Sequence, residues 1–406
     1  MKLQNISPRK FTLLFSTILT VSISTVTYAE LSLPEAINQQ LSPFAPNNPN
    51  KVQCGALLGA DKAEKVLTGG LKEFCSEQLT IPQGATSTAQ GPAMGNADGQ
   101  ATHFRTDYQT AGSEQRLSSH WSFFSSIEQT NADQTITPLA DAVTSNQQRL
   151  NAGFNYLFSS SNQLGVLFHR TSSQGDYDAG GDFSDEGYGF SALADFALGE
   201  EGFLQLSLAK ETASTERNRL AAFTILSGDD EVISIKGTPK SDFNYGETQA
   251  SALLGNSWML ASIKLTPTLG VNWRRNNYGT HSETGDSGLE ITTYNDTIKS
   301  LQAIAGVQAS WAVPLNLGVW APQVGADFIR EFENKSRVLE VSFTGDSRAK
   351  HFSYNTQGGD NSYTILSIGS VFMMKNGWQL FVNLDNHAGY AHYRKTMASM
   401  GVRAEF

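Results

Sequence analysis

The stretch Ile263-Lys264-Leu265-Thr266-Pro267-Thr268-Leu269-Gly270-Val271-Asn272-Trp273-Arg274 decides the fold of this 406-residue chain. Apolar residues occupy every odd position from Ile263 to Trp273, and polar or small residues fill most of the positions between them. A period of two places all the apolar side chains on one face of an extended strand. The stretch therefore predicts a β-strand with one apolar side and one polar side.

The same alternation recurs from Leu117 to Phe406 and divides this part of the chain into about twelve segments. The clearest are 150–158, 164–168, 188–198, 204–208, 250–254, 301–311 and 320–328, and the last three are 362–374, 378–389 and 395–406. Segment 362–374 differs because its apolar residues fall on both faces, which we interpret as contact of one face with a plug. An even number of strands is typical of a bacterial outer-membrane barrel.

The connections between these segments alternate in length. The expected tight links are 159–162, 199–201, 256–259, 313–316 and 375–377. The links that alternate with them are 128–148, 174–185, 213–244, 275–297 and 333–361, with only the last, 390–394, short. Short turns at one end and long loops at the other are typical of a transmembrane barrel, whereas a soluble β-sandwich has no need of one short end.

Aromatic residues near the strand ends, among them Trp121, Trp258, Trp311, Trp320 and Trp378, fit the girdles found at membrane interfaces. No run of 18 apolar residues follows the first thirty positions, so the sequence offers no membrane-spanning helix there. We therefore predict an all-β fold, a 12-stranded antiparallel transmembrane β-barrel over residues 117–406.

The first 29 residues have the pattern of a secretory signal peptide. Lys2, Arg9 and Lys10 precede an apolar run, and small residues lead to an expected cleavage after Ala29. Cleavage there removes three basic residues and no acid, so the formal charge changes from −10 to −13. An acidic exported chain of this kind is not expected to bind nucleic acid.

Residues 30–116 differ from the barrel in composition and in the pattern of their apolar residues. Residues 30–81 form a small N-terminal segment in which one or two short helices are expected, broken at Gly69-Gly70. Cys54 and Cys75 flank these helices and, in an exported protein, predict a disulfide rather than a metal site. Residues 82–116 are small and polar, which is typical of a linker.

The region from Trp320 to the end, with Trp320-Ala321-Pro322-Gln323-Val324, the turn at Asn376-Gly377 and the ending Gly401-Val402-Arg403-Ala404-Glu405-Phe406, resembles the autotransporter β-domain family. The resemblance covers about residues 117–406. It implies that the terminal Phe406 is the signal read by the outer-membrane assembly machinery. It also implies a pore that holds a segment leading from an exported N-terminal passenger, and residues 82–116 are placed to be that segment.

If the apolar faces contact lipid, the opposite faces line a lumen. The charged and polar residues expected there are Asp195, Glu247, Lys264, Asn272, Arg274, Asp327, Asp385, Arg403 and Glu405. Charges of both signs suit a hydrogen-bonded linker, a narrow channel or simply a solvated wall, and the sequence leaves these three open.

Three patterns suggest chemistry that the context does not support. His120-Trp121-Ser122 resembles the spacing in outer-membrane phospholipase A, but alternation turns His120 and Ser122 inward, whereas that family has the pair on the outer face. Ser287, in Gly285-Asp286-Ser287-Gly288, lacks the strand-turn-helix context of a hydrolase. The acidic residues of 176–186 favour a solvated loop, with Ca²⁺ binding left open.

We therefore expect no catalytic residue, cofactor or resident metal. The hypothesis is an outer-membrane translocator barrel that exports or tethers a short N-terminal passenger at the cell surface. Its expected partners are outer-membrane lipid, the general secretion machinery and the barrel assembly machinery. The alternative is a passive or plugged, porin-like channel, and an outer-membrane hydrolase is a more distant one.

Overall fold

The computed structural model describes residues 86–89, 120–137, 139–159, 162–199, 201–226, 232–333, 335–346 and 351–405. These ranges comprise the barrel, the loops that extend it and the short strand formed by residues 86–89. The expected signal peptide, the helical segment with Cys54 and Cys75, and the terminal Phe406 lie outside the described residues.

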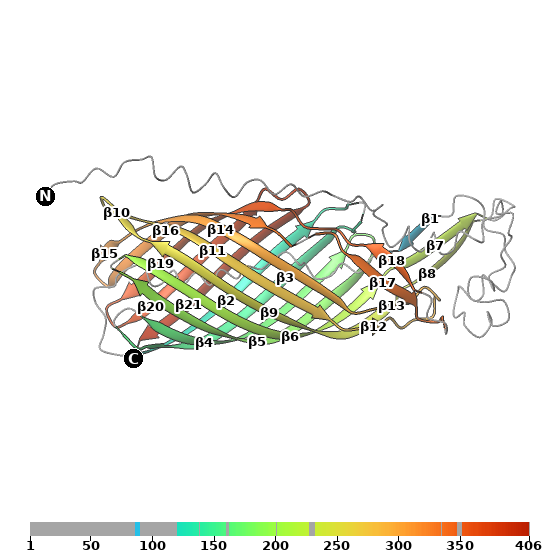
Figure 1. Cartoon of the computed structure of the whole chain (residues 1–406), viewed down its shortest axis with the longest axis horizontal. Coiled ribbons are helices and arrows are strands. Elements are labelled where there is room, and N and C mark those ends of the chain that lie inside the picture. The colour runs from blue at the N-terminus through green and yellow to red at the C-terminus, as the bar shows by residue number, and fades with distance from the viewer. Residues whose placement is uncertain are drawn as a thin grey trace. The chain divides into compact units, whose positions relative to one another are not determined.

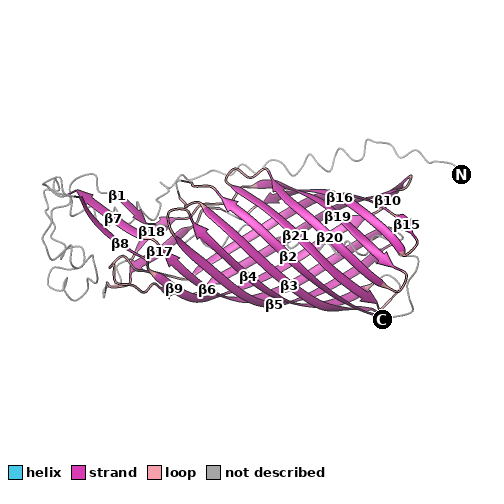
Figure 2. Cartoon of the chain, turned by 180° about the vertical axis from the view of Figure 1, so that it is seen from behind, coloured by secondary structure: helices cyan, strands magenta, loops and turns pink. Residues whose placement is uncertain are grey.

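Twelve antiparallel strands close into a barrel (Figures 1 and 2). In order around the wall they are β2 (Trp121–Gln134), β3 (Val143–Leu157), β4 (Gln163–Tyr177), β5 (Gly181–Leu198), β6 (Gly202–Arg219), β9 (Lys240–Asn256), β11 (Ile263–Tyr278), β14 (Asp296–Trp311), β16 (Gly318–Glu331), β19 (Ser362–Met374), β20 (Trp378–Ala388) and β21 (Tyr393–Glu405). The last strand pairs with the first, from Ser122↔Glu405 to Gln134↔Tyr393. The predicted 12-stranded antiparallel barrel is thereby confirmed.

The two ends of the barrel differ. At the turn end the links are short, and β10 (Trp258–Leu260) and β15 (Val313–Leu315) prolong two hairpins by pairing with β11 and β16. The last described residues of the chain, at the end of β21, also lie there (Figure 1). In the turn before β20, Gly377 adopts a φ of 85°, which glycine tolerates without strain.

Two small sheets extend the opposite, loop end. One is three-stranded and consists of β1 (Thr86–Ala89), β7 (Ala221–Leu226) and β8 (Val232–Gly237). The other, here called the outer sheet, consists of β12 (His281–Ser282), β13 (Ile291–Thr293), β17 (Val338–Phe343) and β18 (Phe352–Asn355). The long loops therefore carry structure of their own.

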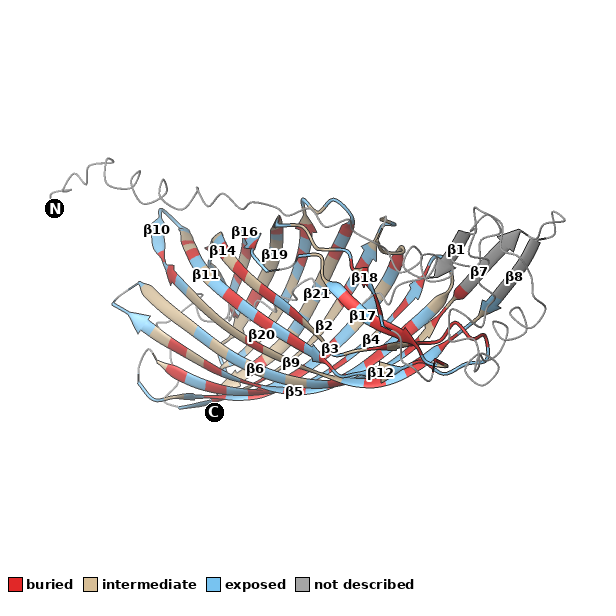
Figure 3. Ribbon diagram, turned by 45° about the vertical axis from the view of Figure 1, so that its right-hand side comes forward, coloured by how far each residue is buried: buried red, intermediate tan, exposed pale blue. Residues whose placement is uncertain are grey.

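The strands alternate between exposed and buried residues along most of their length (Figure 3). On β4, Leu164, Val166 and Phe168 are exposed while Leu167 and His169 between and beside them are buried. Exposed large apolar side chains of this kind occur on all the barrel strands and form the surface expected to meet lipid. Trp121, Trp258, Trp311, Trp320 and Trp378 lie on this outer surface at the turn end.

Two of the predicted long links prove shorter than expected. The segment 174–185 is wrong as a loop, because β4 continues to Tyr177 and β5 begins at Gly181, which leaves a three-residue turn. Likewise, β2 extends to Gln134 and β3 begins at Val143 within the expected loop 128–148. The alternating pattern turns polar where the strands leave the membrane, but the strands themselves do not end there.

The structure explains why 362–374 is apolar on both faces. On β19, Leu366 and Ile368 are exposed on the outer face, whereas Ile365 points the other way and is buried. Ile365 packs with Tyr363, with Ile304 of β14 and with Ile329 of β16 in a cluster on the inner wall. Neighbouring strands thus supply the partners of the second apolar face.

The exposed apolar face predicts that the stability lost on introducing a charge depends strongly on its depth in the membrane. Val166, between Leu164 and Phe168 in the apolar part of the outer face of β4, is 62% exposed. We expect Val166→Arg to lower the unfolding free energy in phospholipid vesicles by about 2–4 kcal/mol, because the guanidinium would enter hydrocarbon. The measurement is guanidinium chloride unfolding followed by tryptophan fluorescence. The control is Ser172→Arg, exposed farther along the same strand, for which about 0–1 kcal/mol is expected. Equal losses at both positions would contradict a lipid-facing Val166.

Candidate functional site

The inner faces of the strands form a polar lumen, and the residues expected there lie on it. Asp195, Asn272, Arg274, Asp327, Asp385 and Arg403 are buried, and Glu247, Lys264 and Glu405 are partly buried. On their strands these residues alternate with outward apolar side chains, as on β11, where Asn272 stands between exposed Val271 and Trp273. The candidate site is therefore the lumen wall rather than a single pocket.

Several of these side chains are bound to other residues of the wall. Asp195 accepts a hydrogen bond from Gln163 (2.7 Å), Asn272 from Gln249 (3.1 Å) and Asp385 from Asn383 (3.0 Å). Arg403 and Glu405, two positions apart on β21, form an ion pair with an N–O distance of 3.6 Å. Hydrogen bonds within the wall compensate for removing these groups from water.

A charged cluster centred on Glu211 was not singled out from the sequence. The Oε2 atom of Glu211, on β6, lies 2.9 Å from His169 Nε2 of β4 and 3.4 Å from Arg149 Nη2 of β3. His169 and Glu211 both stand opposite Gly189 of the intervening strand β5, where a Cβ atom would collide with the imidazole. The missing side chain lets the two residues meet across a strand. The signal available in the sequence was their inward position in the alternation.

A cavity of about 90 Å³ lies in this part of the lumen. Its charged lining residues are Arg149, Arg274 and Lys395 against Asp185, Glu211 and Glu247, three of each sign, and the tyrosines Tyr245, Tyr278 and Tyr393 complete the polar wall. Balanced charge produces no strong net field. The lumen therefore offers a hydrogen-bonding surface to a polar chain without selecting ions of one sign.

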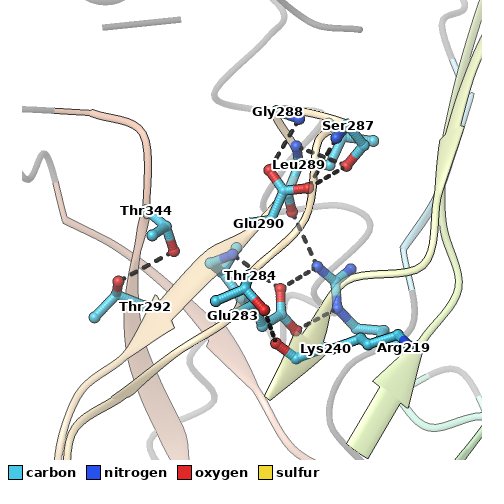
Figure 4. A network of polar contacts seen from close by, with 11 residues as sticks. Arg219, Lys240, Glu283, Thr284, Ser287, Gly288, Leu289, Glu290, Thr292 and Thr344 are labelled. Atoms are coloured by element: carbon cyan, nitrogen blue, oxygen red, sulfur yellow. Dashed lines mark hydrogen bonds and ion pairs between the residues drawn. The ribbon is translucent and has the colours of Figure 1, made fainter. Parts of the chain in front are cut away.

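At the loop end, a buried ion pair ties the loop between β11 and β14 to the barrel rim (Figure 4). Arg219, the last residue of β6, is 2% exposed. Its Nε and Nη2 atoms donate to the two carboxylate oxygens of Glu283 at 2.8 and 2.6 Å, and Nη2 also donates to the carbonyl oxygen of Leu289 at 2.9 Å. Glu283 further accepts a hydrogen bond from the backbone N–H of Ile291 (2.9 Å). One bidentate pair therefore connects Glu283, Leu289 and Ile291 of this loop to the rim.

The same loop bends inward over the lumen. His281 stacks on the inward-facing Phe243 of β9 with ring centroids 3.9 Å apart. Burial lowers the pKa of His281, so the imidazole stays neutral at neutral pH. In the next loop, Tyr354 of β18 is buried, and burial raises its pKa well above the ordinary value. Arg337 of that loop pairs with Asp296, at the start of β14, at an N–O distance of 2.5 Å.

The residues of the motifs with enzyme-like spacing make structural contacts rather than catalytic ones. Ser287 donates through its hydroxyl to Glu290 (2.8 Å) and accepts from the backbone N–H of Leu289, while His281 is stacked on Phe243. His120 is exposed, and Ser122 is buried on the inner face. Among the residues that the structure describes, neither Ser287 nor Ser122 is hydrogen-bonded to a histidine.

The acidic residues of 176–186 do not converge on one point, and they contact different partners. Asp185 faces the lumen and accepts from Ser173 (3.0 Å), whereas Asp182 accepts from Asn218 (2.7 Å) and Glu186 pairs with Arg170 on the outer face (3.4 Å). Within the described ranges, no group of three or more His, Cys, Asp or Glu side chains is placed to hold a metal ion.

Comparison with known proteins identifies the family. The model of the autotransporter beta-domain matches residues 123–385. The chain belongs to the autotransporter beta-domain family. As a member of this family, the barrel resides in the bacterial outer membrane. Among the residues that the structure describes, no helix is long and apolar enough to cross a membrane.

Two solved structures of autotransporter domains have the same fold. The translocator domain of the autotransporter NalP from Neisseria meningitidis is 13% identical over 74% of this chain and 94% of its own, with a TM-score of 0.55. The beta domain of the Bordetella autotransporter BrkA is 14% identical over 71% of this chain and 100% of its own, with a TM-score of 0.51. No curated protein matches the chain.

The buried pair at the rim yields a local prediction. Glu283→Gln leaves the buried guanidinium of Arg219 without the carboxylate that it is paired with, so we expect the loop 279–295 to lose about 3 kcal/mol of local stability. Hydrogen exchange of the amides of 281–291 should then accelerate roughly a hundredfold. The control is Glu216→Gln, which removes an exposed carboxylate from β6, the strand of Arg219. Unchanged exchange in Glu283→Gln would show that the pair does not hold the loop.

Proposed function

We propose that this barrel is a translocator: residues 82–116 cross its lumen, and residues 30–81 are exported as a short passenger that is released or stays tethered at the cell surface. The residues that carry this role are those of the lumen wall, including Asn272, Arg274 and Asp327. Their inward position makes the wall of the pore polar.

The observation that carries the proposal is the position of β1. Residues 86–89 pair with β7, from Thr86↔Thr224 to Ala89↔Ala221, and β7 follows the end of β6 at the loop end. The first barrel strand begins at Trp121, at the opposite, turn end. The 31 residues between Ala89 and Trp121 therefore have to connect the two ends of the barrel.

Length and solvation favour the lumen as the route. An extended chain of 31 residues reaches about 100 Å, whereas an 18-residue strand such as β6 is about 60 Å long and tilted. A polar segment outside the wall would expose unpaired N–H and C=O groups to hydrocarbon, each at a cost of several kcal/mol. The lumen, with its hydrogen-bonding groups, avoids that cost.

The export route follows from the same proposal. Residues 1–29 direct the chain to the general secretion machinery, and Phe406 presents the barrel to the outer-membrane assembly machinery. We propose that a disulfide between Cys54 and Cys75 closes the passenger and stabilises a segment too small for a full core. Because 30–81 is far shorter than a β-helical passenger, we infer no adhesin, protease or toxin activity for it. We likewise propose that the barrel is not an enzyme.

The decisive test is the topology of the N-terminal segment in intact cells. An epitope tag inserted near Asn48 should be removed by external protease, because the segment lies outside the cell. A tag in the turn at Asn376-Gly377 is the matched control and should be digested only after the outer membrane is permeabilised. Protection of the Asn48 tag until permeabilisation would rule out surface display.

The alternative is a passive or plugged, porin-like channel, and the charged cavity in the lumen is the feature that favours it. Conductance in planar bilayers separates the two. We expect deletion of 30–116 to raise single-channel conductance several-fold, because an aqueous pore replaces an occupied one. The matched control, deletion of 30–81 alone, should leave conductance low because the linker remains. High conductance of the intact chain would support the channel instead.

A further inference from the structure

On several strands the outer surface of the barrel changes from apolar to positively charged at the loop end of the apolar band. The last outward apolar residue is Phe168 on β4, Leu208 on β6, Trp273 on β11, Leu301 on β14 and Phe328 on β16. The next outward residue on these strands is Arg170, Lys210, Arg275, Lys299 and Arg330, respectively, and all five are exposed. These five cations are here called the outer basic girdle. Five of the twelve strands thus leave the apolar band with a cation.

Three members of the girdle lie in one row across the sheet. Lys210 is opposite Thr248, Thr248 is opposite Arg275, and Arg275 is directly opposite Lys299. Like charges opposite each other destabilise an antiparallel pair. Arg275 donates through Nε to Asn277 Oδ1 (2.9 Å), a neutral acceptor. Among the described residues, no carboxylate forms an ion pair with Lys210, Arg275, Lys299 or Arg330.

The protein's own outward acids are few near this level. Glu186 pairs with Arg170 at 3.4 Å, and both side chains are about half exposed. On β6 the next outward acid is Glu216, six positions beyond Lys210, and on β9 it is Asp242, six positions beyond Thr248. A strand residue advances about 3.3 Å, so these carboxylates lie roughly 20 Å farther along their strands. Within the part of the chain that the structure describes, no ion pair therefore relieves the repulsion within the row.

The turn end is different. Its outward band carries Trp121, Trp258, Trp311, Trp320 and Trp378, which suit the interface of an ordinary bilayer leaflet. The cations of the girdle gather at the loop end, where the long loops place the outside of the cell. A row of three cations at the boundary between apolar and polar surface matches an anion that belongs to a lipid, since a lipid phosphate sits at that depth.

We propose that the outer basic girdle binds the phosphate groups of a phosphorylated lipid in the outer leaflet. Arg275 and Lys299 share one phosphate, which turns their mutual repulsion into attraction for the same anion, and Lys210 and Arg330 extend the contact to either side. Guanidinium groups bind phosphate through two N–H donors, and the ammonium groups act as point charges. The apolar residues just below, such as Trp273 and Leu301, contact the acyl chains.

The test uses the purified full-length chain in dodecyl maltoside and lipopolysaccharide as the probe. Lipid retained after gel filtration is quantified per mole of protein. We expect Arg275→Gln/Lys299→Gln to weaken binding of the phosphorylated lipid roughly tenfold. The matched control is Lys335→Gln/Lys375→Gln, which removes the same charge from exposed sites in a loop and a turn and should bind like the unaltered chain.

A second probe keeps the proposal falsifiable even if the variant folds poorly. Enzymatically dephosphorylated lipopolysaccharide should be retained by the unaltered chain roughly tenfold less than the phosphorylated form, and raised salt should reduce retention of the phosphorylated form. Equal retention of the two lipids, or equal retention by the girdle variant and the control, would overturn the proposal. Neither result would bear on translocation, because the girdle lies on the outer face of the wall.

Discussion

The seam between β2 and β21 is the interaction on which the rest of the structure depends. Hydrocarbon offers no partner to a backbone N–H or C=O group, so an open sheet would leave two unsatisfied edges in the membrane. Pairing from Ser122↔Glu405 to Gln134↔Tyr393 removes both edges at once. Closure also fixes which face of every strand meets lipid, because a shift of one residue would exchange the two faces. The apolar surface and the polar lumen are therefore two consequences of one constraint.

Much of this fold was predictable because the signals are local. A period of two in stretches such as 263–273 fixes both the strand and its lipid face, and short turns such as 375–377 fix the pairing of neighbouring strands. Strand ends were harder to predict. Above the membrane the outward residues become polar, as at Arg170 and Ser172 on β4, while the strand continues to Tyr177. Loss of the apolar alternation therefore marks the membrane boundary rather than the end of the strand.

The candidate site was predictable in position but not in its contacts. Alternation places Asn272 and Asp327 inward, yet it does not tell which side chains meet. Glu211 reaches His169 only because Gly189 leaves a gap between them, and Arg219 meets Glu283 across 64 residues of sequence. These pairs depend on strand register and on how the loops fold back, which no local pattern encodes. Residues 30–81, Cys54, Cys75 and Phe406 lie outside the described residues, and what the sequence indicates for them stays a prediction.

Charged pairs have opposite roles in the lumen and at the rim. A wall that a polar chain crosses must solvate it without holding it, and pairing of wall charges with one another, as in Arg149 with Glu211 and Arg403 with Glu405, leaves little attraction for a passing group. At the rim, Arg219 and Glu283 are buried together, and removing either charge would leave the other buried without its partner. Pairs along the lumen wall therefore keep the passage weakly binding, whereas the pair of Arg219 and Glu283 fixes the loop that borders it.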